Sequence, residues 1–449
     1  MEKIWLRNYP AGIPHEVEIN EFASLKDVLQ RSCERFAGLP AYANMGASMS
    51  YAELDRNSRD FAAYLQNTLA LRKGDRVAIM MPNLLQYPVA LFGVLRAGLV
   101  VVNVNPQYTV PELEHQLKDS GAAAIVVLEN FAHTLQAVLE KDPGLKLHVI
   151  TTEVGDMFPL LKEVLTNVVV KYVKKMVPQW HIPGATEFNA ALRAGQSQPL
   201  ADVALTHADT AFLQYTGGTT GVAKGAVLTH GNMVANVQQL SAWIAHDLLD
   251  GKEILVCPLP LYHVYALTCN LVFMKIGAHN VLVTNPRDMP AFMRDLKRYP
   301  FTAIIGVNTL YRALLDAPGF IDVDTRSLKL TNAGGMAVQR IVAERWKKAT
   351  GVPIVEAYGL TETSPGAISN PLNIADWTGA IGMPVPSTLA TIMDESDNEM
   401  PIGEVGEICV RGPQVMQRYW NRPDETAKVF IRDGWLRTGD MGFVDERGY

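Results

Sequence analysis

A stretch from Gln214 to Ala226, QYTGGTTGVAKGA, combines glycines, threonines and a lysine with almost no bulky side chain. Consecutive backbone N–H groups in such a turn can surround an anion, and hydroxyl and ammonium groups add further donors. The spacing is not that of a Walker loop, because Lys224 is separated from Gly221 by two residues and is followed by Gly225. The stretch predicts a loop that holds phosphate. A flexible surface loop is the alternative.

The elements around this loop alternate between helices and strands. Amphipathic spacing predicts helices over residues 54–69 and 86–96, and the apolar run 98–106 predicts a buried strand followed by a turn. A helix capped by Thr109 should end near Gly121. Further apolar strands that end in small or polar residues are AAAIVVL, EILVCPLP, FTAIIGVN, LKLTNAGG and VPIVEAYG, with a helix over 338–350 between the last two. This order implies parallel sheets covered on both faces, with ligands beyond the carboxyl ends of the strands.

The character of the sequence changes after Asn370. The stretches GEICVRG, GWLRTGD and MGFVDERGY are short, alternating and bounded by turns, which is typical of antiparallel strands. We therefore predict an α/β fold with three parts. A first α/β subdomain covers residues 1–205, a second with the phosphate loop covers 206–369, and a smaller β-rich, barrel-like subdomain covers 370–449.

Composition excludes several classes of protein. The 449 residues suffice for two or three subdomains, and a formal net charge of −6 argues against nucleic-acid binding. The four cysteines lie far apart without a CxxC pair, which indicates a reduced, cytoplasmic setting and argues against cysteine catalysis or a zinc site. The N-terminus is not expected to be a secretory signal, and no uninterrupted apolar stretch has membrane length.

Five motifs, in this order along the chain, resemble those of the adenylate-forming superfamily, which includes acyl-CoA synthetases, luciferases and peptide-synthetase adenylation domains. They are YTGGTTGVAKG (215–225), PLPLYHVYAL (258–267), NAGGM (332–336), EAYGLTET (356–363) and GWLRTGD (434–440). Two more stretches, MMPNLLQYPVALFGVLRAG and VVNVNP, are similar to bacterial long-chain fatty-acid–CoA ligases. The resemblance extends from about Gly74 to the end of the chain.

The resemblance implies a two-step, ATP-dependent ligase. A fatty carboxylate would displace pyrophosphate from ATP to give an acyl adenylate, and the thiol of CoA would then displace AMP to give acyl-CoA for fatty-acid degradation. The expected partners are fatty acid, ATP and CoA, with Mg²⁺ as the metal. Two alternatives stay open, a nucleotide hydrolase or kinase that uses the same loop, and a non-catalytic lipid-binding protein.

The resemblance also implies roles for individual residues. Lys224 and the threonines before it would hold the phosphates, and Thr361 and Glu362 the metal and the α-phosphate. Tyr358 would stack on adenine and Asp440 would accept from the ribose hydroxyls, unless they are an ordinary core tyrosine and a turn aspartate. The whole nucleotide-binding set is Tyr215, Thr216, Gly217, Gly218, Thr219, Thr220, Gly221, Lys224, Gly334, Gly335, Met336, Glu356, Ala357, Tyr358, Gly359, Leu360, Thr361 and Asp440.

Smaller sets follow for the other roles. The expected catalytic residues are Lys224, Thr361, Glu362 and His263, and the expected metal ligands are Thr220 and Glu362. His263 is assigned to positioning the acyl group and not to proton transfer, because an aromatic-flanked histidine in an apolar run is usually a core residue. The expected acyl site consists of His263, Gly306, Val307, Asn308, Thr309 and Gly334.

A basic and apolar segment, NVVVKYVKKMVPQW (167–180), places Lys171, Lys174 and Lys175 among valines and aromatic side chains. Such a segment can lie in a membrane interface with anionic lipid, which predicts peripheral contact with the cytoplasmic face of the inner membrane. A solvated helix face is the alternative. The oligomeric state stays open, with a homodimer as one option.

The resemblance places a hinge just beyond Tyr449, followed by a small C-terminal lid domain with a lysine that reaches the adenylation site. The sequence is expected to lack this domain. On that expectation the chain should bind nucleotide, form the adenylate slowly and form almost no thioester.

Overall fold

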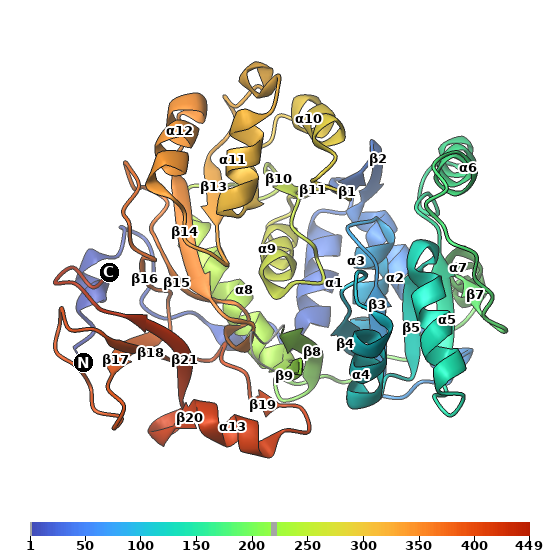
Figure 1. Ribbon diagram of the computed structural model, residues 1–449, viewed down its shortest axis with the longest axis horizontal. Helices are drawn as coiled ribbons and strands as arrows, with labels where there is room; N and C mark the ends of the chain where they lie inside the picture. The colour runs from blue at the N-terminus through green and yellow to red at the C-terminus, as the bar shows by residue number, and fades with distance from the viewer. Residues whose placement is uncertain (1, 217–221) are drawn as a thin grey trace.

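The computed structural model describes residues 2–216 and 222–449. Two α/β units stand side by side, and a small antiparallel sheet packs at the outer end of the second unit (Figure 1). This arrangement confirms the predicted fold class, α/β with two largely parallel sheets and a β-rich part. Within the described ranges, no helix is both long and apolar enough to cross a membrane.

The first unit is built on an eight-stranded sheet in the order β19-β9-β8-β4-β3-β5-β6-β7. Strands β8 to β7 in this order run parallel, and β9 and β19 are antiparallel additions at one edge. The strands are β3 (Arg76–Met80), β4 (Val100–Asn103), β5 (Ala124–Leu128), β6 (His148–Thr152), β7 (Thr186–Glu187), β8 (Thr210–Thr216), β9 (Lys224–Thr229) and β19 (Arg418–Tyr419). The helices of this unit are α2 (Tyr51–Asn67), α3 (Gln86–Arg96), α4 (Val110–Ser120), α5 (Ala132–Lys141), α6 (Leu160–Val168) and α7 (Phe188–Gln196).

The second unit is built on a nine-stranded sheet in the order β16-β15-β14-β13-β12-β10-β11-β1-β2. Its strands are β1 (Pro40–Asn44), β2 (Ala47–Ser50), β10 (Ile254–Cys257), β11 (His279–Leu282), β12 (Ala303–Gly306), β13 (Leu330–Ala333), β14 (Ile354–Gly359), β15 (Gly366–Ser369) and β16 (Met383–Pro384). Its helices are α1 (Leu25–Arg35), α8 (His230–Ile244), α9 (Val264–Lys275), α10 (Met289–Arg298), α11 (Asn308–Asp316) and α12 (Arg340–Thr350).

The small sheet has the order β17-β18-β21-β20 and is wholly antiparallel. Its strands are β17 (Leu389–Met393), β18 (Gly406–Arg411), β20 (Phe430–Ile431) and β21 (Trp435–Gly442), and α13 (Pro423–Val429) precedes β20. Within MGFVDERGY the strand β21 ends at Gly442. Asp445 accepts hydrogen bonds from the backbone N–H groups of Arg447 and Tyr449, which closes the turn expected at the end of this stretch.

Local sequence signals explain where several helices begin and end. Thr109 and Glu112 form a reciprocal capping box at the start of α4, and Gly121 ends that helix in the left-handed conformation. Ser50 and Glu53 form the same box at the start of α2. The predicted helix over 86–96 coincides with α3, and α12 begins two residues later than predicted.

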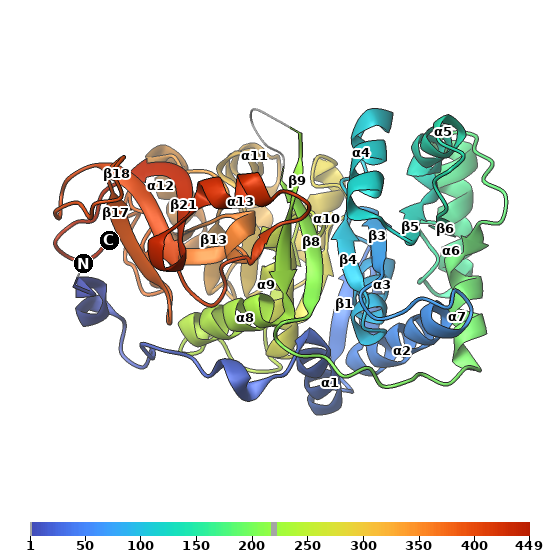
Figure 2. The same cartoon turned by 90° about the horizontal axis from the view of Figure 1, so that it is seen from below.

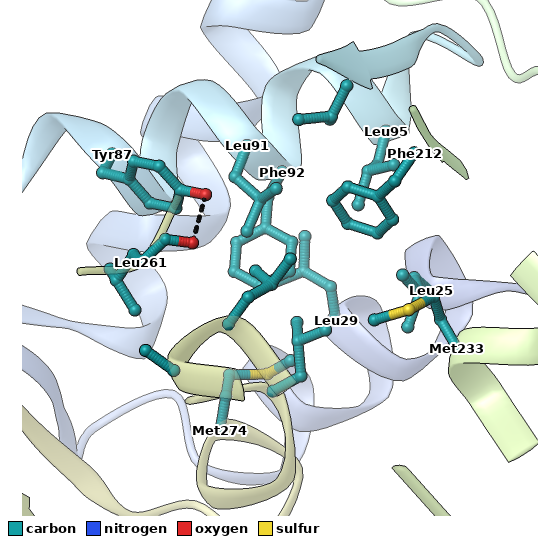
Figure 3. Packing of buried hydrophobic residues seen from close by; sticks show 14 of the residues in the cluster. Leu25, Leu29, Tyr87, Leu91, Phe92, Leu95, Phe212, Met233, Leu261 and Met274 are labelled. Atoms are coloured by element: carbon teal, nitrogen blue, oxygen red, sulfur yellow. Dashed lines mark hydrogen bonds between the residues drawn. The ribbon is translucent and has the colours of Figure 1, made fainter. Parts of the chain in front are cut away.

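One hydrophobic core runs through both α/β units. It joins residues of β3 to β5 in the first sheet with residues of β1, β10 and β12 in the second. Figure 3 shows its centre, where α3 packs on α1 and α9 with Leu91 and Leu95 among the buried side chains. Tyr87 of α3 is fully buried and donates from its hydroxyl to the carbonyl oxygen of Leu261, at 2.8 Å. The two units are therefore held together by packing, with paired polar groups inside it.

The sheets exchange strands across the subdomain boundaries predicted from the sequence. Strands β1 and β2 come from the first 50 residues but join the second sheet, and β8 and β9 follow residue 205 but join the first. The hairpin of β8 and β9 thus lies between the two halves of the molecule, as Figure 2 shows from below. The boundaries at 205 and 369 stay a proposal about the chain and do not separate the sheets.

Candidate active site

A cavity of about 910 Å³ opens at the carboxyl ends of strands β12, β13 and β14, beside the β8–β9 hairpin. One end of it is polar and the other is apolar. The predicted site residues that line it are Tyr215, Thr216, Lys224, His263, Gly334, Gly335, Ala357, Tyr358, Gly359, Leu360, Thr361, Glu362 and Asp440. Residues from five separate motifs therefore meet in one place, at the edge where parallel sheets usually bind ligands.

The predicted phosphate loop falls between the end of β8 and the start of β9 in the sequence. Thr216 and Lys224 are cross-strand partners at the end of this hairpin, so both face the polar end of the cavity. Gly217, Gly218, Thr219, Thr220 and Gly221 lie outside the described residues, and their predicted roles stay predictions.

Lys224 contacts a segment that the sequence analysis did not identify. Its ammonium group lies 2.8 Å from the carboxylate of Glu425, in α13, and 4.8 Å from the ring centre of Tyr419, in β19. The hydrogen bonds from Lys224 and then from Lys428 lower the pKa of Glu425 to about 2. The Lys224 cation is thus held in place by an acidic group that an incoming phosphate would have to share or displace.

Glu362 is held by the same segment. The hydroxyl of Tyr419 donates to Oε1 of Glu362 at 2.5 Å, and the N–H of Met416 donates to the backbone carbonyl of Glu362 at 2.8 Å. Burial and the charge of Glu362 raise the pKa of Tyr419, so its hydroxyl remains a donor. The carboxylate of Glu362 is therefore fixed in direction at the polar end of the cavity.

Tyr358 and Asp440 form the third side of the polar end. The Tyr358 hydroxyl donates to Oδ2 of Asp440 at 2.6 Å, which ties the end of β14 to β21 of the small sheet. Burial raises the pKa of Tyr358. The backbone at the next residue, Gly359, packs directly against Pro365: a Cβ at position 359 would lie only 1.7 Å from the carbonyl oxygen of Pro365. Only glycine fits there.

His263 stands at the start of α9. Its Nδ1 accepts a hydrogen bond from the N–H of Tyr265 and so caps the helix, at 3.3 Å. Burial lowers the pKa of His263, which keeps its imidazole neutral near pH 7. This is consistent with a positioning role in an apolar setting.

The neighbouring network fixes the loop after β13. The hydroxyl of Tyr265 donates to Oδ1 of Asn332 at 2.5 Å, and the amide of Asn332 donates to the carbonyl of Val355 at 3.1 Å. Gly334 and Gly335 follow at the cavity wall, where the ring of Tyr265 lies 3.3 Å from the position of a Cβ at Gly334. Glycine at position 334 therefore leaves room for the ring of Tyr265 at this wall.

The apolar end runs along one face of α9. The lining residues Val264, Tyr265, Thr268, Cys269, Val272 and Phe273 recur every three or four positions, which places them on a single side of the helix. Leu240, Trp243 and Ile244 of α8 line the cavity with them, and Ile305, Leu330 and Val355 come from the strands. Gln214 donates to the carbonyl of Tyr262 at 2.7 Å, so α9 starts beside the hairpin and leads away from it.

The family model for AMP-binding enzymes matches residues 29–420. The chain belongs to the AMP-binding enzyme family. Over 450 aligned residues it is 54% identical to a long-chain-fatty-acid–CoA ligase of Escherichia coli O6:H1, with all of this chain and 80% of that protein covered. It is 49% identical to the long-chain-fatty-acid–CoA ligase of Haemophilus influenzae, with 99% and 79% covered. A crystal structure of an anthranilate–CoA ligase in complex with anthranoyl-AMP has the same fold, with a TM-score of 0.82 at 22% identity over 96% of this chain and 78% of that one.

Some predicted residues of this AMP-binding enzyme lie away from the cavity lining. Glu356 is buried and accepts from the N–H of Val338 at 2.8 Å, so it holds the loop that leads to α12. Met336 is about half exposed. Ile305, one residue before the predicted acyl wall, lines the cavity, whereas Gly306, Val307, Asn308 and Thr309, all within the described residues, do not. Their acyl role stays a prediction.

Tyr419 and Glu425 are the functional candidates that sequence reasoning missed. They lie in RYWNRPDETA, about 60 residues beyond the EAYGLTET motif, and no local pattern links them to it. Their contacts with Glu362 and Lys224 arise because β19 pairs with β9 next to the phosphate loop. In the sequence, the one hint of a role was an aromatic and an acidic residue near the start of a helix, and such a pattern is weak evidence for a site.

Proposed function

We propose that this AMP-binding enzyme activates long-chain fatty acids to acyl-CoA through an acyl adenylate. The observation that carries the proposal is the cavity itself, whose polar end meets an apolar channel along α9. A carboxylate at the junction, with its chain in the channel, would face a nucleotide bound at the polar end. The relatives named as long-chain-fatty-acid–CoA ligases, at 49–54% identity, support the choice of fatty acid.

In the first step an oxygen of the fatty carboxylate forms a bond to the α-phosphorus of ATP, and pyrophosphate leaves. The protein contributes alignment and charge neutralisation, since the substrate is itself the nucleophile. Lys224 and Thr216 hold the phosphates, Tyr358 and Gly334 contact the adenine, and Asp440 accepts from the ribose. His263 and the start of α9 position the carboxylate, and the apolar walls exclude water from the mixed anhydride.

In the second step the thiol of CoA gives up its proton to solvent, its sulfur forms a bond to the acyl carbon, and AMP leaves with the electrons of the broken C–O bond. The products are acyl-CoA, which enters fatty-acid degradation, and AMP. The same groups that stabilise charge at the α-phosphate stabilise AMP as the leaving group.

The donor set at the polar end fits Mg²⁺. This ion usually takes one or two protein carboxylates and completes its coordination with phosphate oxygens and water. Glu362 offers an oriented carboxylate beside Thr361, while within the described residues no cluster of three or more acidic, histidine or cysteine side chains forms a closed metal site. Bound there, Mg²⁺ would neutralise phosphate charge.

Fatty-acid-dependent exchange of labelled pyrophosphate into ATP tests the proposal. Exchange requires reversible adenylation, so purified protein should show it with palmitate and not without fatty acid. Pyrophosphate exchange that is equal with and without fatty acid, or release of phosphate in place of exchange, would favour a hydrolase. Fatty-acid binding without either reaction would favour a lipid-binding protein.

Replacing Asp440 by asparagine should raise the KM for ATP by about tenfold or more, because a charged acceptor of two ribose hydroxyls becomes a neutral amide. The KM for fatty acid should change little. Initial rates at varied ATP measure this, with Asp433→Asn as the matched control, since Asp433 is exposed and does not line the cavity. An unchanged KM for ATP would remove Asp440 from the nucleotide site.

We also propose that the protein works in the cytoplasm, with peripheral contact to the cytoplasmic face of the inner membrane, where its apolar substrate is enriched. The support is the basic segment 167–180, in which Lys174 and Lys175 are exposed. Lys171 is instead paired with Glu129 at 3.1 Å and with Glu153 at 3.5 Å, so it is not available to lipid in the way the sequence suggested.

A further inference from the structure

Helix α6 is amphipathic, but its apolar side chains face solvent and its polar side chains face the protein. It has no buried residue, and Leu161 is 88% exposed while Leu160 is 73% exposed. Val164 and Leu165, one turn further on, are also exposed. Surface helices of globular proteins normally present the opposite face to water. An outward apolar helix therefore points to a partner that is itself apolar.

The polar side chains of α6 hold it to the protein. Asn167 accepts from the N–H of Gly155 at 2.8 Å, and Glu163 accepts from the amide of Asn189 at 3.2 Å. Lys162 lies over the ring of Phe158, with its ammonium group 5.0 Å from the ring centre. The helix is thus fixed in this orientation by specific contacts and is not simply undocked.

The exposed apolar surface continues into the turn that follows. Residues Val169–Val173 extend the helix as a single π-type turn, and Tyr172 and Val173 are about 70% exposed. Lys171 points the other way, to the buried carboxylate of Glu129, which fixes the turn. We call the six residues Leu160, Leu161, Val164, Leu165, Tyr172 and Val173 the outer face of α6.

The exposed charge at the rim of the outer face is positive. Residues 157–180 contain Lys162, Lys171, Lys174 and Lys175 against a single acidic residue, Glu163, and of these lysines Lys171 is paired with Glu129 and Glu153. Lys174 and Lys175 are both exposed at its rim. Apolar side chains bordered by lysines are the pattern of an element that lies in the interface of an anionic membrane.

We propose that the outer face of α6 inserts into the headgroup region of an anionic lipid bilayer and is the part of the molecule that makes the proposed membrane contact, on which this inference rests. A second copy of the chain is a poorer occupant, because a twofold contact through this face would bring the exposed Lys174 and Lys175 of two copies together. In Figure 1, α6 stands at the far edge of the first unit from the small sheet. Binding through it leaves the catalytic cavity, between α8, α9 and β21, uncovered.

Vesicle co-sedimentation tests the proposal with two kinds of vesicle, phosphatidylcholine mixed with phosphatidylglycerol, and phosphatidylcholine alone. The double variant Leu161→Glu/Leu165→Glu should lower the bound fraction on mixed vesicles by about tenfold or more, because it removes two inserted side chains and adds like charge. Lys174→Glu/Lys175→Glu should weaken binding to mixed vesicles alone. Ile321→Glu/Ile341→Glu is the matched control, since both residues are exposed isoleucines elsewhere on the surface.

Each outcome decides one of the claims. Binding of the unchanged protein that the Leu161/Leu165 variant retains would overturn the role of α6 and leave the membrane contact standing. No binding of the unchanged protein to either vesicle would overturn both. A dimer that the same variant converts to monomer would assign the face to a second copy and overturn the proposal. Pyrophosphate exchange with soluble octanoate, measured in parallel, should be equal in all variants, so a failure of the proposed chemistry appears separately.

Discussion

Glu362→Gln protein is expected to form acyl adenylate at a rate about 10²–10³-fold below that of the unchanged protein. The substitution keeps the size of the side chain and its contact with Tyr419 but removes the negative charge that would hold Mg²⁺ against the phosphates. The fold should persist, because Glu362 lines the cavity and belongs to none of the hydrophobic core clusters. Pyrophosphate exchange over a range of Mg²⁺ concentrations measures the effect.

Two further variants separate charge from orientation at this site. Tyr419→Phe leaves the carboxylate but removes the hydroxyl that points to it, so the rate should fall by about tenfold and recover in part at high Mg²⁺. Glu404→Gln, at an exposed surface glutamate, should change nothing. An adenylation rate and a Mg²⁺ dependence that are both unchanged in Glu362→Gln protein would falsify the metal assignment.

Val272→Trp protein is expected to lose long-chain substrates and to keep short ones. Val272 lies eight residues after Val264 on the face of α9 that lines the cavity, which is about 12 Å along the helix axis. An indole at that point would fill the apolar end and leave the junction with the polar end open. The ratio of kcat/KM for octanoate to that for palmitate should rise by at least about tenfold, equivalent to ~1.4 kcal/mol.

The controls for this variant change the same position. Val272→Ala enlarges the channel and should leave palmitate a good substrate. Val272→Phe fills less of the channel than Val272→Trp, so its ratio of kcat/KM for octanoate to that for palmitate should be intermediate. The KM for ATP reports whether the polar end is intact. A parallel loss of octanoate and palmitate activity at unchanged ATP affinity would show that the chain does not run along α9.

From the sequence, the residues of the site could be predicted more completely than the residues that hold them in place. Motif residues such as Tyr358 and Glu362 could be found because the backbone they need is local, a strand end followed by a glycine turn. Tyr419 and Glu425 could not, since their roles depend on the pairing of β19 with β9, which are about 190 residues apart in sequence. Strand pairing over such a distance leaves no periodic signal.

The fold shows the same division. The bounds of α3 and α4 followed from apolar spacing and from the caps at Thr109 and Gly121. Apolar runs identify buried strands without saying which sheet each one joins, so the crossing of β1 and β2 into the second sheet could not be predicted. For α6, the sequence pattern shows that one side is apolar but not that Asn167 and Glu163 turn the polar side inward.

The core that passes through α1, α3 and α9 has a consequence for how the molecule comes apart. This core contains side chains from both large sheets, packed against one another. Unfolding of one sheet would therefore expose the apolar side chains of the other. Denaturation of the two α/β units should therefore be a single cooperative event, and partial opening should be confined to elements outside that core, such as α6. The cavity between the two sheets should therefore persist until the whole fold unfolds.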